Sequence, residues 1–144
     1  MKNFVKQFTE EEIPDVMKIG RKYFQARTEL QSAMEELKIN REPEHIGLFL
    51  GEEKRKRFLP AIGMLDILNE MTERKAIIDD KAEWLFLCGR DVFEKSVLEC
   101  RFEKGPALVM NKKEEVLGYG VLNRGNIKIE NRLDRGDFLR REMK

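Results

Sequence analysis

The spacing of the apolar residues changes along the chain, and this change limits the folds that the chain can adopt. In the first half, apolar residues recur at intervals of three and four, as in 29–38, which is typical of an amphipathic helix. In the second half they form short runs that follow or contain glycines, which is typical of strands: the run 107–110 follows Gly105, and the run 115–122 contains Gly118 and Gly120. The sequence therefore predicts a helix-rich α/β part followed by an all-β part.

Three helices and one hairpin are expected in the first half. The helices cover 29–38, 61–71 and a segment that starts at Thr9, which can cap it, and continues through Val16, Ile19, Tyr23 and Phe24. The apolar runs 46–50 and 57–59 predict a hairpin. A further strand is expected at 75–78, and strands at 84–88, 107–110, 115–122 and 127–131 follow it. Short strands at this spacing, with glycine turns, predict a small barrel.

The charges of the 144-residue chain nearly cancel, but they are unevenly distributed. There are 28 basic and 27 acidic residues, which excludes a polycation that coats nucleic acid by bulk charge. Residues 1–77 hold 14 basic and 14 acidic residues, 78–115 hold 7 and 9, and 116–144 hold 7 and 4. The positive surplus therefore lies near the C-terminus, where a basic face is expected.

Several classes of protein are excluded by what the chain lacks. No apolar run reaches the roughly 18 residues of a membrane span, and the start 1–6 has no apolar signal segment. Cys88 and Cys100 have no metal-ligand spacing, so we expect reduced, buried thiols in the cytoplasm. The acidic pair 79–80 is expected to cap a loop rather than bind a metal. With one histidine, His45, no catalytic triad is evident, and we expect no enzyme, metal or cofactor.

The strand expected near the C-terminus carries cations that point away from its apolar residues. Lys128 and Arg132 flank this strand, while Ile127 and Ile129 face the other way. Arginine binds phosphate with two donors and stacks on bases, so these cations are candidates for contact with an RNA backbone. The alternative is the solvated face of a charge-rich protein, because charged residues are mostly exposed in any case.

The run Lys54-Arg55-Lys56-Arg57 is a second dense group of cations. A run of this kind can contact nucleic acid. It lies at the turn of the expected hairpin, directly after Glu52 and Glu53, where cations also discourage edge-to-edge pairing of strands. We therefore favour a solvated turn for this run.

Segments spread along nearly the whole chain resemble, in order, those of one protein family. They are Phe8–Glu12, Gly47–Gly51, Leu65–Leu68, Lys75–Ile78, Phe86–Gly89, Leu117–Val121 and Gly136–Glu142. Together they resemble the nuclear-import-protein-seven group (UPF0113-like) of ribosome-biogenesis factors, in which a pre-PUA domain precedes a PUA domain, a small RNA-binding barrel. Eukaryotic members carry more chain between the first two helices, where this sequence has only 25–28. The resemblance therefore suggests an archaeal homologue with a reduced N-terminal sheet.

The resemblance implies an α+β fold with two domains. A small α/β pre-PUA domain would cover 1–77, and a PUA-type β pseudo-barrel would cover 78–144. It also implies a non-enzymatic, cytoplasmic, monomeric factor in ribosomal RNA processing and large-subunit assembly. Its partners would be ribosomal or uridine-rich RNA and assembly proteins such as an SBDS-like factor, with no membrane. Two alternatives remain open: a PUA accessory subunit that guides an RNA-modifying enzyme, and a protein-only scaffold.

The family's basic PUA surface lies near its last strands, and the resemblance places it on particular residues here. The implied RNA-binding residues are Lys128, Arg132 and Arg135, with Arg124 and Arg140 as neighbours and Arg90 beside a glycine turn. The resemblance implies no catalytic residue and no metal ligand.

Overall fold

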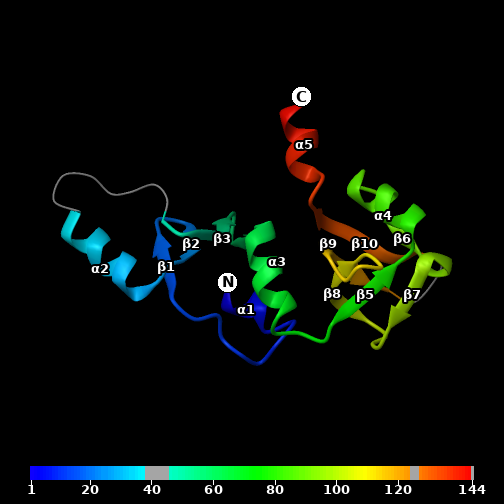
Figure 1. Cartoon of the computed structure of the whole chain (residues 1–144), viewed down its shortest axis with the longest axis horizontal. Coiled ribbons are helices and arrows are strands. Elements are labelled where there is room, and N and C mark those ends of the chain that lie inside the picture. The colour runs from blue at the N-terminus through cyan, green and yellow to red at the C-terminus, as the bar shows by residue number, and fades with distance from the viewer. Residues whose placement is uncertain (38–45, 124–126, 144) are drawn as a thin grey trace.

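Two β-sheets, one in each half of the chain, organise the fold (Figure 1). The computed structural model describes residues 1–37, 46–123 and 127–143. The N-terminal half contains α1 (Lys2–Val5), β1 (Val16–Ile19), β2 (Lys22–Gln25), α2 (Thr28–Leu37), β3 (Leu48–Lys54), β4 (Arg57–Pro60) and α3 (Ile62–Asn69). Its strands form an antiparallel sheet in the order β1-β2-β3-β4.

The C-terminal half forms a nearly closed barrel. Its elements are β5 (Lys75–Ile78), α4 (Asp80–Leu87), β6 (Val92–Phe93), the 3₁₀ turn η1 (Glu94–Ser96), β7 (Val97–Cys100), β8 (Gly105–Met110), β9 (Val116–Leu122), β10 (Ile127–Asp134) and α5 (Asp137–Glu142). The six strands are ordered β6-β10-β9-β8-β5-β7, and β5 runs parallel to β8. The two edge strands, β6 and β7, are joined only by η1, so the sheet curls until its edges lie near each other. The predicted α+β class with a C-terminal pseudo-barrel is confirmed.

Much of the predicted order of elements is confirmed. The expected hairpin is β3–β4, the expected helix at 61–71 is α3, and the expected strands at 75–78, 107–110, 115–122 and 127–131 are β5, β8, β9 and β10. Helix α2 matches the expected helix at 29–38 up to Leu37, and residue 38 lies outside the described residues. These segments are apolar runs whose length and flanking turns suit only one kind of element.

The helix expected from Thr9 is wrong, because this segment forms the β1–β2 hairpin. Thr9 instead accepts a hydrogen bond from the Glu11 backbone nitrogen at 3.1 Å and so closes a local turn. Asp15 and Gly20 have φ angles of 56° and 60°, which a helix does not allow. The β-branched and aromatic residues that fit a helical spacing also favour a strand, and pairing with β3 decides between the two. The segment therefore supplies two of the four strands of the N-terminal sheet.

The strand expected at 84–88 is also wrong, because these residues belong to α4 and its C-terminal end. Asp79 caps the helix, since its carboxylate accepts a hydrogen bond from the Ala82 backbone nitrogen at 2.8 Å. This confirms a capping role for the acidic pair. Phe86 is buried, whereas Trp84 on the opposite face is 67% exposed. Cys88, which we expected to be buried, is exposed because it ends the helix.

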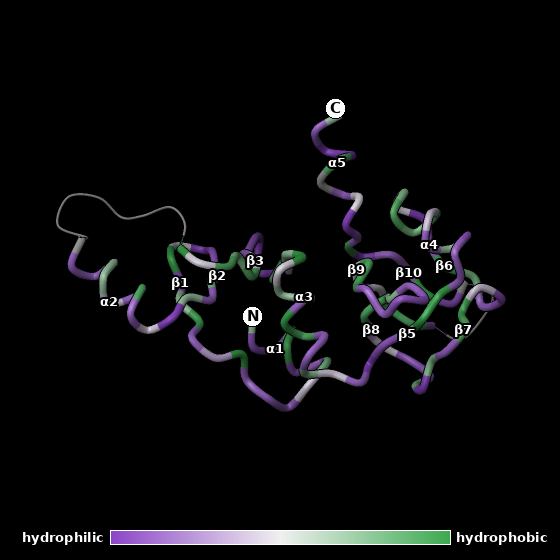
Figure 2. The backbone as a smooth tube through the Cα atoms, in the orientation of Figure 1, coloured by the Kyte–Doolittle hydropathy of each residue, from purple (hydrophilic) through white to green (hydrophobic). Residues whose placement is uncertain are grey.

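The two halves share one hydrophobic core. Its buried members include Leu50 of β3 and Leu65 of α3 from the first half, and Leu108 and Met110 of β8 from the second. Val109, between them, faces a second cluster that fills the barrel. Figure 2 shows the hydrophobic stretches along α3, β5 and β8 that form these clusters.

The two-domain division at 77 and 78 stays a prediction. The boundary falls within β5, whose pairing with β7 and β8 places the strand in the barrel sheet. The aromatic ring of Phe4 in α1 also lies 5.4 Å from that of Tyr119 in β9, edge to face. Contacts therefore cross the expected boundary through both the sheet and the core.

Candidate nucleic-acid interface

Strand β10 places alternate side chains on the outer face of the barrel. Ile129 is fully buried, while Lys128, Glu130 and Arg132 alternate with it toward the other face. In the register with β9, Asn131 lies opposite Gly120 and Leu133 lies opposite Tyr119. Arg132 is therefore the extra residue of a β-bulge, a feature that redirects a side chain.

Gly120 allows β10 to approach closely at this point. A Cβ atom at position 120 would lie 2.4 Å from the Glu130 carbonyl oxygen. Any side chain at position 120 would push β9 and β10 apart. Gly120 therefore has a packing role in β9.

Lys128 is more covered than the alternation predicts. Its side chain is 20% exposed, and Nζ lies 3.8 Å from Oε1 of Glu94 in η1. The edge strand β6 flanks it, because Phe93 lies opposite Ile127 and Val92 lies opposite Ile129. Lys128 therefore already has an anionic partner at the rim of the barrel.

Arg90, Arg132 and Arg135 are the exposed arginines of the predicted set among the described residues. Arg132 Nη2 donates to Glu130 Oε2 at 2.9 Å, in a pair whose side chains are both about half exposed, and such pairs are weak enough to be exchanged for another anion. The Asn131 side chain donates to the Arg90 carbonyl oxygen at 3.4 Å. The Asp91 carboxylate accepts from the Asn131 backbone nitrogen at 2.9 Å. These bonds hold the loop that carries Arg90 beside the residue that precedes Arg132.

Arg140 is held by hydrogen bonds within the protein, although its side chain is 37% exposed. Its guanidinium donates to both carboxylate oxygens of Asp134, at 2.9 and 2.8 Å, and to the Leu87 carbonyl oxygen at 2.6 Å. Asp134 is only 2% exposed. The hydrogen bonds with this carboxylate raise the pKa of Arg140 above its ordinary value. Arg140 therefore fastens α5 to the end of α4 and to β10.

Arg135 connects the two halves of the molecule. Its Nε donates to the Val116 carbonyl oxygen, and its Nη2 donates to the Asp66 carboxylate in α3, both at 2.5 Å. Arg124 lies outside the described residues. Of the six predicted RNA-binding residues, Arg90 and Arg132 thus lie exposed on segments that Asn131 joins, whereas Arg135 and Arg140 are held by bonds to other residues of the chain.

Two exposed aromatic side chains near this face were missed by sequence analysis. Trp84 on α4 is 67% exposed, and Phe93 on β6 is 52% exposed. Exposed aromatic rings beside cations are the usual platform on which single-stranded bases stack. Trp84 could have been found from the spacing of Ala82 and Phe86, because a helix that buries this pair turns Trp84 outward.

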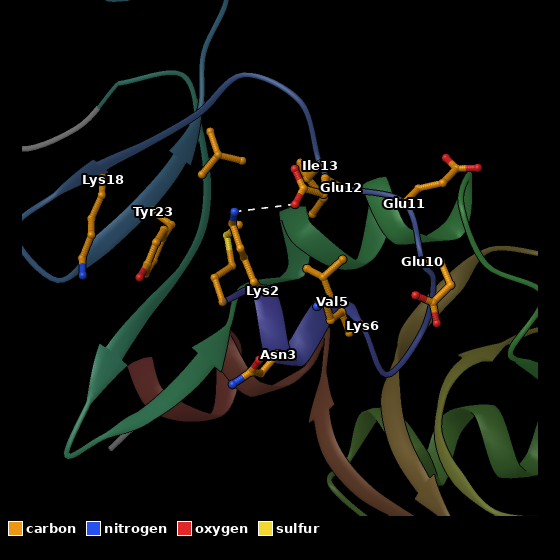
Figure 3. Close-up of a pocket in the computed structure, with 12 residues that line it drawn as sticks. Lys2, Asn3, Val5, Lys6, Glu10, Glu11, Glu12, Ile13, Lys18 and Tyr23 are labelled. Atoms are coloured by element: carbon orange, nitrogen blue, oxygen red, sulfur yellow. Dashed lines mark ion pairs between the residues drawn. The ribbon is translucent and has the colours of Figure 1, made fainter.

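One hollow of the described chain is lined by residues of the N-terminal half. It occupies about 640 Å³ between α1 and the β1–β2 hairpin (Figure 3). Its lining mixes both signs of charge, and Lys2 Nζ lies 3.6 Å from Glu12 Oε1. None of the predicted RNA-binding residues lines it.

Neither a metal site nor a membrane-spanning helix is evident in the described residues. They contain no group of three or more histidine, cysteine, aspartate or glutamate side chains that could hold a metal ion. None of their helices is long and apolar enough to cross a membrane.

Comparisons with known proteins place the barrel in a described family. Residues 74–143 match the family described as the UPF0113 PUA domain. A UPF0113 protein from Archaeoglobus fulgidus is 30% identical over 112 residues, and the match covers 69% of this chain and 64% of that protein. The chain therefore spans less than two thirds of this relative.

Two archaeal structures share the fold. The structure of a conserved PUA domain protein from Thermoplasma acidophilum has a TM-score of 0.53 and 19% identity, and covers 67% of this chain and 70% of that chain. A hypothetical protein from Pyrococcus horikoshii has a TM-score of 0.50 and 16% identity, and covers 67% of this chain and 68% of that chain. These similarities support the PUA-type barrel.

Proposed function

We propose that the chain belongs to the UPF0113 PUA domain family, which residues 74–143 match, and that it binds RNA through its C-terminal barrel. The observation that carries the proposal is the surface around Arg90 and Arg132, where two exposed guanidinium groups lie on the barrel and exposed aromatic rings lie on neighbouring elements. This combination suits single-stranded RNA, which offers both phosphates and unstacked bases.

The hydrogen bonds and ion pairs of each predicted residue suggest its role in RNA binding. Arg90 and Arg132 neutralise phosphates, and Lys128 joins them when a phosphate replaces Glu94. Trp84 and Phe93 stack on bases. Arg135 and Arg140 hold β10 and α5 in place and are positioning residues. Arg124 completes the set as a further contact.

The wider role that we propose is that of a non-enzymatic factor in ribosome biogenesis. The resemblance to the nuclear-import-protein-seven group supports this role, with ribosomal or uridine-rich RNA and an SBDS-like assembly protein as partners. A monomer in the cytoplasm, with the division into 1–77 and 78–144, also remains our prediction. Crosslinking in cells, followed by identification of bound RNA and co-purified proteins, tests the role. Recovery of an RNA-modifying enzyme in place of pre-ribosomal particles would favour the accessory subunit.

RNA binding itself is tested by fluorescence anisotropy with a labelled single-stranded oligouridylate. We expect the double variant Arg90→Ala with Arg132→Ala to bind more weakly. The slope of log affinity against log salt should flatten by about 0.7 for each lost phosphate contact. Arg101→Ala is the matched control, because Arg101 also pairs with a glutamate two residues away, Glu99, at 3.3 Å. Equal affinity and slope for the wild type and the double variant would exclude this surface.

A further inference from the structure

The two hairpin turns of the N-terminal sheet lie at the same end of that sheet. Lys22, the first residue of β2, lies opposite Glu52 near the end of β3. The Glu53 backbone nitrogen also donates to the Arg21 carbonyl oxygen at 2.8 Å. The turn between β1 and β2 is therefore adjacent to the turn between β3 and β4, although some 30 residues separate them in the sequence.

Together the two turns form a cluster of six cations, which we call the basic tip: Arg21, Lys22, Lys54, Arg55, Lys56 and Arg57. All six side chains are exposed. Among the described residues, none of the six makes a side-chain hydrogen bond or an ion pair. Like charges on two adjacent turns act as one patch, because charges interact over about 8 Å in physiological salt.

The acidic residues beside the tip do not neutralise it. Glu53 accepts a hydrogen bond from the Tyr23 hydroxyl at 2.6 Å and from Lys18 Nζ at 3.2 Å. These bonds, the one from Tyr23 first, lower the pKa of Glu53, so this carboxylate is charged but already occupied. Glu52 faces Lys22 across the sheet and so opposes one of the six positive charges.

The backbone conformation of the turn between β3 and β4 does not explain why cations occupy it. Arg55 and Lys56 have φ angles of 49° and 63°, in the left-handed region. A two-residue hairpin turn of this kind favours Asn-Gly or Asp-Gly, which adopt positive φ with less strain. Cations therefore stand at two positions where local stability favours other residues.

We propose that the basic tip is a second contact site for the phosphate backbone of RNA, separate from the barrel surface. The inference rests on the proposed RNA binding and extends the bound strand to the N-terminal sheet. Phosphate is the ligand that the tip suits, because three of its six cations are arginines, which bind phosphate with two donors. Six like charges in one patch suit the evenly charged phosphate backbone of RNA, whereas protein interfaces are usually centred on apolar or aromatic anchors.

The test is the double variant Arg55→Asn with Lys56→Gly, which removes two cations and installs residues that suit the turn. The probe is the labelled oligouridylate, titrated at several salt concentrations. The affinity should fall about fivefold, since exposed charge contacts contribute modestly, and the salt slope should flatten by about 1.4. The melting temperature should stay the same or rise, because the new turn is less strained.

The matched control is Lys104→Ala with Lys113→Ala, which removes two exposed cations that, like those of the tip, have no ion pair among the described residues. It should leave the affinity and the slope close to those of the wild type. Equal binding by the wild type and the tip variant would overturn the proposal, and so would equal losses in the tip variant and the control.

Two further outcomes separate this inference from the proposed function. If the wild type does not bind oligouridylate at physiological salt, the proposed function fails and the tip loses its ligand. A parallel titration with polyglutamate tests for an acidic protein partner. Binding of polyglutamate that the tip variant loses, together with unchanged RNA binding, would reassign the tip and overturn the RNA contact.

Discussion

The cations of the barrel and those of the basic tip differ in what they touch. Along β10 and α5, Lys128, Arg132, Arg135 and Arg140 each lie within 4 Å of a carboxylate. The six cations of the tip have no such partner among the described residues. Local counting of charge pointed to the C-terminal stretch, yet much of that surplus is used to hold the structure together. Availability for a ligand depends on the partners of a cation as well as on its position.

The two regions also differ in how their charges affect folding. A buried carboxylate such as Asp134 needs its cation, because an unpaired buried charge is costly. The exposed cations of the tip stabilise nothing that the structure records and repel one another. Substitutions in the barrel should therefore change stability first, and substitutions in the tip should change binding first.

The largest effect is expected in the core that joins the two regions. Leu108→Ala removes a fully buried side chain of β8 that packs on the N-terminal half, and the unfolding free energy should fall by about 2–5 kcal/mol. The fluorescence of the single tryptophan reports on the barrel, and circular dichroism reports on the whole chain. If the two halves unfold as one cooperative unit, both signals should change at the same urea concentration. Two separate midpoints would show that the regions fold independently. Leu98→Ala, at an exposed position, is the control.

A smaller loss is expected from Asp134→Ala. This change leaves the Arg140 guanidinium and the Asn131 side chain without their shared acceptor, and we expect a loss of about 2–3 kcal/mol in urea unfolding. Glu99→Ala, which breaks an exposed pair with Arg101, should cost at most about 0.5 kcal/mol. Equal stability of the two variants would contradict the structural role assigned to Arg140.

The smallest effect is expected beside the tip, in the dependence of stability on pH. The Tyr23 and Lys18 hydrogen bonds lower the pKa of Glu53 below its ordinary value of 4.5. Glu53 therefore stabilises the fold above pH 4.5, and this stabilisation is lost as the pH falls through the lowered pKa. Tyr23→Phe should reduce the fall in melting temperature between about pH 5 and pH 3. An unchanged fall would show that the hydroxyl has no effect on Glu53.

The sequence predicted the fold best where an apolar run had one clear period. Helix α3, the β3–β4 hairpin and strands β8 to β10 lie where their spacing and turns indicated. The segment 16–25 fits a helix and a strand equally well, and only pairing with β3 selects the strand. The run at 84–88 is ambiguous in the same way, and the cap at Asp79 selects the helix. The sequences of strands β6 and β7 show no clear strand pattern. These strands form because they pair with β10 and β5.

The candidate RNA surface was predictable only in part, for a related reason. The sequence named Arg132 and Arg90 as candidates, and both side chains are exposed, as arginine side chains usually are. It could not tell them from Arg135 and Arg140, because the partners Asp66 and Asp134 are brought within reach only by the packing of α3 and α5. The basic tip was visible as the run at 54–57, but its union with Arg21 and Lys22 depends on the β2–β3 register.

The sequence by itself determined the α+β class, the order of the main elements and the identity of the cations, because periodicity and charge are local properties of the chain. The tertiary structure decided which cations are free, which segments become strands and how the two halves join. Hydrogen bonds and ion pairs form between groups that are distant in the sequence, so pairing is settled only when the chain has folded. The net charge of the chain is near zero, yet two basic surfaces differ. The cations of the barrel mostly have carboxylate partners, and those of the basic tip have none among the described residues.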